Sequence, residues 1–302
     1  MSQTVVVGLD DSQLAARALP FARTVARLWG GRMVLVHATA HQDGPSFSGL
    51  NDLADALRRE GIDAEAVVRA PPPARAIVDV AGERNAALIV MASHQRHGLD
   101  RWVHGSVTEA VLQNATTPLL VVPAHALPSS GQTVRVLVPL DGSTAGEAAL
   151  DFLKDWATRR PIEVLLLRVV LNPGVLVGWD PALVVPPIDD DEMRAEVRQA
   201  QAYLEERAQE LSASGMRTRH QVIETAEPVA RVILDTARRE HVEGIALGTH
   251  GRGGVARLVL GSESEDVLEQ SHVPVLLVRS RAGASASSAG QSAEATSAAR
   301  LQ

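Results

Sequence analysis

The chain has 302 residues, of which 45% are hydrophobic and 22% are charged, a length typical of about two domains. Its net charge of −7 and its lack of basic runs exclude a general nucleic-acid-binding role, and the absence of cysteine excludes disulfides, thiolate catalysis and cysteine-ligated zinc. The N-terminus reaches an aspartate too early for a signal peptide, and no apolar run is long enough to span a bilayer. We therefore expect a cytoplasmic protein that binds no membrane.

The first half of the chain predicts five strands separated by helical segments. Continuous apolar runs of this kind are typical of strands that are buried on both faces. Strands that alternate with helices indicate a parallel sheet covered by helices on both sides. The predicted strands are residues 5–9, 32–38, 64–69, 87–92 and 119–122.

The second half repeats this pattern. Residues 92–122 and 248–278 are identical at 13 of 31 positions without a gap, which indicates a duplication. The offset between the halves grows from 131 to 156, so the second half carries about 25 extra residues, which we place at 172–190. The fold predicted is α/β, with two tandem open parallel five-stranded sheets flanked by helices. The strands of the second half are residues 136–140, 163–170, 220–224, 244–248 and 275–278.

Composition suggests the domain boundaries. We expect a first domain at 1–123, a linker at 124–133, a second domain at 134–280 and a disordered Ala/Ser/Gly-rich tail at 281–302. The final strand of each half is short and apolar and is expected at the edge of its sheet. An exposed edge of this kind needs to be covered by another part of the protein.

A glycine pattern precedes the last helix of the second half. Gly248, Gly251, Gly261 and Ser262 form a Gly-x2-Gly-x9-Gly-Ser motif between a strand and a helix. Glycines let the backbone approach an anion, and a helix N-terminus adds partial positive charge, so the pattern is typical of phosphate binding. The only lysine, Lys154, follows no glycine loop, which excludes a Walker-type mechanism.

The first half holds an eroded copy of this motif. Ala92 and Gln95 replace the first two glycines, whereas Gly105 and Ser106 are retained. A long side chain at position 95 would stand where the backbone should meet phosphate, and we therefore predict weaker nucleotide binding there, or none. Asp10, at the end of the first strand, completes this weaker candidate site.

With these motifs and with Leu-Asp-Gly-Ser at 140–143 and Leu-Asp-Asp-Ser at 9–12, the chain resembles the universal stress protein family in its tandem form. The resemblance implies an adenine nucleotide alpha-hydrolase-like, Rossmann-like fold. In nucleotide-binding members, it places Asp141 beside the adenine and ribose and the glycines and Ser262 along the phosphates. The implied ligand is ATP, alone or with Mg²⁺. The resemblance also implies that the final strands of the two halves pair as an internal pseudo-dimer, and we hypothesise a homodimer of chains.

Each site residue also has a structural alternative. Ser262 with Glu265, and Ser106 with Glu109, match the capping box of a helix N-terminus. Asp141 could stabilise a helix dipole without touching a ligand.

The charged residues around the glycine loop do not decide whether the loop binds phosphate. Arg252 and Arg257 could contact phosphate or lie solvated on the surface. Glu263 could compete with a bound anion or help to hold a divalent cation. His94, His97 and His104 have no neighbouring ligand cluster in the sequence, so no metal site is predicted.

We expect a nucleotide-responsive stress or regulatory protein that binds ATP mainly through its second half. The first alternative is a slow ATPase or phosphotransferase, which would need a positioned base; the sequence offers no candidate, so no catalytic residue is predicted. The second alternative is an interaction scaffold that binds no nucleotide.

Overall fold

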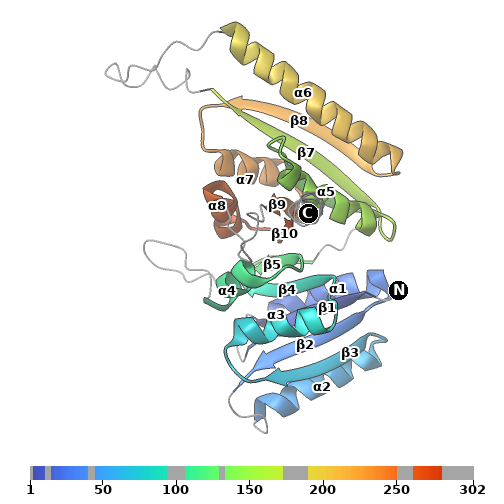
Figure 1. Ribbon diagram of the computed structural model, residues 1–302. Helices are drawn as coiled ribbons and strands as arrows, with labels where there is room; N and C mark the ends of the chain where they lie inside the picture. Colours follow the sequence, from blue (N-terminus) through green and yellow to red (C-terminus); the bar gives the residue numbers. More distant parts are fainter. Residues whose placement is uncertain are drawn as a thin grey trace, which may run out of the picture.

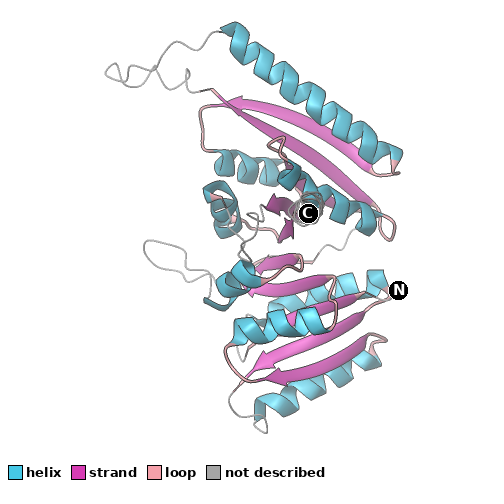
Figure 2. Ribbon diagram, viewed as in Figure 1, coloured by secondary structure: helices cyan, strands magenta, loops and turns pink. Residues whose placement is uncertain are grey.

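The computed structural model describes residues 3–10, 15–39, 45–93, 106–128, 133–172, 190–249 and 261–280. They form one sheet of ten strands in the order β3-β2-β1-β4-β5-β10-β9-β6-β7-β8, with helices on both faces (Figures 1 and 2). Within each half every pair of neighbouring strands is parallel. The α/β fold with a parallel sheet flanked by helices, predicted from the sequence, is confirmed.

The first half begins with β1 and a short 3-10 helix and alternates strands with helices to β5. Its elements are β1 (Thr4–Leu9), η1 (Ala15–Ala18), α1 (Leu19–Trp29), β2 (Arg32–Ala38), α2 (Pro45–Arg59), β3 (Asp63–Arg69), α3 (Pro73–Glu83), β4 (Leu88–Ser93), α4 (Ser106–Asn114) and β5 (Leu119–Pro123).

The second half repeats the order. Its elements are β6 (Val134–Pro139), α5 (Thr144–Ala157), β7 (Ile162–Leu171), α6 (Asp190–Ala213), β8 (Arg217–Thr225), α7 (Val229–Arg239), β9 (Gly244–Thr249), α8 (Ser262–Gln270) and β10 (Val275–Arg279). Among the described residues, none of these helices combines the length and apolar character that a bilayer crossing requires.

The two largest apolar clusters of the described residues lie on opposite faces of the sheet. Neighbouring residues of one strand point to opposite faces, so Val5 belongs to one core and Val6 to the other. The first core packs against α1, α2, α5 and α6, and the second against α3, α4, α7 and α8. The continuous apolar runs of the sequence thus correspond to strands covered on both sides.

The register of the third strands corrects one detail of the predicted repeat. Arg32 pairs with Asp63 and Glu163 with Arg217, so the offset here is 154 (217 minus 63), not the 156 implied by aligning 64–69 with 220–224. The offset reaches 156 at α3 and α7, because Pro73 corresponds to Val229. The extra length is therefore spread over several elements. The connection from β7 to α6 is 12 residues longer than that from β2 to α2, α6 is nine residues longer than α2, and β8 is two residues longer than β3.

The two halves join through their last strands. β5 and β10 pair antiparallel, with Leu120 opposite Leu276. The expected pairing of the final strands is therefore present within the chain, and it leaves β3 and β8 as the outer strands of the sheet.

Candidate functional site

A cavity of about 520 Å³ opens at the carboxyl ends of β6, β7 and β9. The chain leaves β6 toward β7 on one side and later returns to β9 on the other, so β6 and β9 flank a topological switch point. Open α/β sheets bind ligands at such points, and the volume lies within the range of small-molecule sites. Asp141, Gly248, Gly261 and Ser262 all line this cavity, so the structure brings four of the predicted residues together.

Asp141 lies in the turn between β6 and α5. Its Oδ1 accepts hydrogen bonds from the amide of Ser143 at 2.9 Å and from the Ser143 hydroxyl at 2.6 Å. The Ser143 hydroxyl in turn accepts from the amide of Gly146 at 3.0 Å and caps α5. Gly142, with a φ of 82°, adopts the left-handed conformation that this tight turn requires.

These contacts keep Asp141 charged. Burial alone would raise its pKa, but the two hydrogen bonds from Ser143 and the charge of Arg168 outweigh burial, so the pKa lies below its usual value. An ionised carboxylate only accepts hydrogen bonds. Asp141 therefore presents an acceptor to a ligand that offers N–H or O–H groups.

Arg168 is a lining residue that the sequence analysis missed. It projects from β7, and its Nη1 donates to the Leu140 carbonyl at 3.3 Å. In the first half the equivalent residue is His37, offset by 131, whose Nδ1 lies 3.2 Å from the Leu9 carbonyl. A charged residue inside the apolar run 164–171 of β7 was the signal that could have revealed it.

Gly248 has a packing role besides its place in the cavity wall. A Cβ at this position would lie 1.9 Å from the Ala145 carbonyl oxygen and 2.6 Å from that of Gly146. The backbone of β9 therefore packs directly against the first turn of α5. This close approach of strand and helix accounts for a glycine here independently of any phosphate.

The motif's last two residues form the start of α8. Gly261 is the N-cap residue, with extended backbone, and among the described residues no side chain caps this helix. Ser262 is the first helical residue, and the amide of Glu265 donates to the Gly261 carbonyl at 3.0 Å. The capping-box alternative for Ser262 is thus wrong, because the helix begins one residue too early for it. Ser262 instead lines the cavity.

Glu263 contacts a second helix. Its Oε2 accepts a hydrogen bond from the amide of Ala230 at 2.8 Å, in the first turn of α7. Glu263 also lines the cavity. Its carboxylate is therefore held at the helix N-terminus of α7, where negative charge is favoured.

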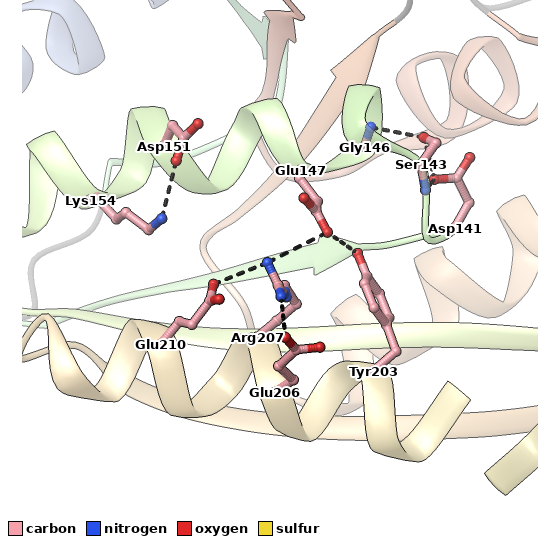
Figure 3. A network of polar contacts seen from close by, with 10 residues as sticks. All are labelled: Asp141, Ser143, Gly146, Glu147, Asp151, Lys154, Tyr203, Glu206, Arg207 and Glu210. Carbon is pink, nitrogen blue, oxygen red and sulfur yellow. Dashed lines mark hydrogen bonds and ion pairs between the residues drawn. The ribbon is translucent and has the colours of Figure 1, made fainter. Parts of the chain in front are cut away.

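A polar network behind the cavity joins α5 to α6 (Figure 3). The Tyr203 hydroxyl donates to Glu147 Oε1 at 2.7 Å, and Arg207 Nη1 lies 3.9 Å from the same oxygen. Burial and the carboxylate of Glu147 raise the pKa of Tyr203 well above its usual value. With offsets of 131 and 154, the first half has Ala16 and Gly49 at the positions of Glu147 and Tyr203, so the network belongs to the second half alone.

The other predicted positions are placed only in part. Asp10 directly follows β1, and Ser106 is the first residue of α4. Gly105, Gly251 and Arg252 lie outside the described residues, as do Gln95, Arg257, His94, His97 and His104. Across the ranges that the structure describes, no group of three or more His, Asp or Glu side chains could hold a metal ion.

Comparison with known proteins identifies the family to which the chain is similar. The model of the universal stress protein family matches residues 1–123 and again residues 133–279. A universal stress protein of Mycolicibacterium smegmatis is 26% identical over 305 residues, covering 92% of this chain and 97% of that protein. The universal stress protein Rv2005c of Mycobacterium tuberculosis is 30% identical over 232 residues, which cover 74% of this chain and 70% of that protein.

A solved structure supports the same fold. The crystal structure of a universal stress protein from Archaeoglobus fulgidus superimposes with a TM-score of 0.68 at 21% identity. The match covers 92% of this chain and 99% of that one. Both halves of the chain therefore take part in the similarity.

Proposed function

This chain belongs to the universal stress protein family, and we propose that it is a nucleotide-responsive regulatory protein whose second half binds an adenine nucleotide such as ATP. A regulatory binder needs only different affinities for two states of the protein, and no catalytic group. The observation that carries the proposal is that one cavity at the switch point is lined both by Asp141 and by the N-terminus of α8.

Each end of the cavity suits one part of a nucleotide. The ionised Asp141 offers acceptors for the amino group of a base or the hydroxyls of a ribose. The first amides of α8, after Gly261, are not hydrogen-bonded within the helix and can bind phosphate oxygens. We propose Gly248, Gly251, Arg252 and Ser262 as further parts of this site.

The first half is proposed to bind nucleotide weakly or not at all. Its own equivalents, Asp10, Gly105 and Ser106, would form the weaker site. A stoichiometry of one nucleotide per chain is therefore expected in calorimetric titration of the full-length protein.

Substitution of Gly261 tests the site. A Cβ there meets no atom of the described residues within 4 Å, and its φ of −72° suits any residue, so the described part of the fold has room for a side chain. Gly261→Glu places a carboxylate at the N-terminus of α8, where the phosphates are proposed to lie, and should reduce ATP affinity at least a hundredfold in calorimetry.

Gly261→Ala is the matched control, because it adds bulk without charge and should weaken ATP binding much less. The site assignment is wrong if Gly261→Glu melts at the wild-type temperature and still binds ATP with wild-type affinity.

We also propose that two chains associate. Because β5 and β10 already pair within one chain, this association must use other surfaces. Light scattering with and without ATP measures both the association and its dependence on ligand; a monomer under both conditions contradicts it.

A further inference from the structure

Glu263 places a negative charge at the end of the cavity proposed for phosphate. The first turn of α8 carries two carboxylates, Glu263 and Glu265. Of the two, Glu263 lines the cavity, and its hydrogen bond from Ala230 holds it in position. Its equivalent in the first half is Val107, offset by 156, so the repeated fold does not itself require an acid here.

Basic residues do not offset this charge in the described wall. Among the described residues that line the cavity, Asp141, Glu196 and Glu263 are acidic and Arg168 is the one cation. Arg168 donates to the Leu140 carbonyl and lowers the pKa of Asp141, so its charge is already engaged by the turn that follows β6. The described part of the phosphate end is therefore formed by helix amides, serine hydroxyls and one carboxylate.

We propose that Glu263 is a specificity-determining residue that makes affinity fall as the negative charge on the ligand's phosphates rises. The cavity would then prefer a Mg²⁺-bound nucleotide, in which the metal has neutralised part of this charge, to the free polyphosphate. This inference rests on the proposed function, because it concerns the same cavity.

The size of the effect follows from Coulomb interaction near a protein surface. Two charges about 7 Å apart alter affinity by roughly threefold for each unit of ligand charge in water, and by more where the cavity excludes water. Free ATP carries about two more charges than AMP, so the repulsion from Glu263 should weaken ATP relative to AMP by roughly tenfold.

The experiment compares Glu263→Gln with the wild-type protein. Glutamine keeps an oxygen that can accept from Ala230, and it removes only the charge. Calorimetric titrations at low salt would use adenosine, AMP, ATP with a chelator, and ATP with excess Mg²⁺. We expect Glu263→Gln to tighten free ATP roughly a hundredfold, AMP and Mg²⁺-bound ATP roughly tenfold, and adenosine not at all.

Glu265→Gln is the matched control, because it removes a charge from the same turn of α8 at a residue that is not among those lining the cavity. Glu265→Gln should change the ratio of the free ATP affinity to the AMP affinity less than Glu263→Gln does. Equal changes for all four ligands, or equal effects of the two variants, overturn the inference and leave the proposed function standing. If none of the four ligands binds to the wild-type protein or to either variant, the proposed function is overturned, and the inference with it.

Discussion

At the scale of single residues, Gly248 and Gly261 belong to one motif, but different physical constraints explain a glycine at each position. Gly248 is required where β9 meets α5, because backbone carbonyl oxygens occupy the space of a side chain. No atom of the residues that the structure describes lies within 4 Å of a Cβ at Gly261, so packing against them does not require a glycine there. The sequence pattern alone could not separate a packing glycine from one that a ligand approaches.

This difference predicts the outcome of two alanine substitutions. In Gly248→Ala the new methyl group would lie 1.9 Å from the Ala145 oxygen, and backbone atoms cannot rotate away. We expect a loss of about 1–3 kcal/mol in the free energy of unfolding, the usual cost of overpacking. In Gly261→Ala no described atom is displaced, and the loss should stay below about 1 kcal/mol. Urea denaturation of both variants measures the difference, and a Gly248→Ala protein as stable as the wild type contradicts the packing argument.

Site residues were predictable where their chemistry lies in a local pattern. Asp141 directly follows a predicted strand, and Ser262 lies at the start of a predicted helix. Both residues line the cavity. Arg168 lies within a regular strand, and strand register brings it to the cavity. No local pattern encodes such proximity, so Arg168 was not predicted from the sequence.

At the scale of elements, β8 shows why strand bounds were harder to predict than strands. The predicted strand covered 220–224, whereas β8 spans Arg217–Thr225. β8 lies at the edge of the sheet, and its exposed residues interrupt the apolar run by which the inner strands were recognised. Inner strands such as β2 were predicted at their observed bounds because both of their faces are buried.

The contact between α5 and α6 gives a prediction that can be observed directly. Tyr203 is the only tyrosine of the chain, so the absorbance change of tyrosine ionisation reports on it alone. Because burial and Glu147 raise its pKa, no tyrosinate should form near pH 10 while the protein stays folded, whereas the denatured chain should titrate at about pH 10.

Circular dichroism at each pH verifies that the protein is folded during this titration. In Glu147→Gln the carboxylate charge is gone, so the Tyr203 pKa should move back toward its usual value. A wild-type protein that is folded and ionises Tyr203 near pH 10 would show that the hydrogen bond to Glu147 is absent.

At the scale of the whole molecule, the seam between the halves is small but apolar. Besides the β5–β10 pairing, Trp29 of α1 contacts Phe152 and Trp156 of α5, each with ring centroids 6.1 Å apart in edge-to-face geometry. Gln3 and Asp155 add a hydrogen bond of 3.1 Å across the seam. One continuous sheet with this aromatic cluster predicts that the two halves unfold together.

Removing Trp29 should separate the two halves energetically. Trp29 is 4% exposed, and Trp29→Ala should cost about 3–5 kcal/mol, part of it in contacts that join the halves. Calorimetry should show one transition for the wild type and two for Trp29→Ala, because the loss of coupling lets each half melt at its own temperature. Leu57→Ala is the control: Leu57 is buried in α2 within the first half, so this variant should lower the melting temperature and keep a single transition. Two transitions already in the wild-type protein, or a single one in Trp29→Ala, would show that the aromatic cluster does not couple the halves.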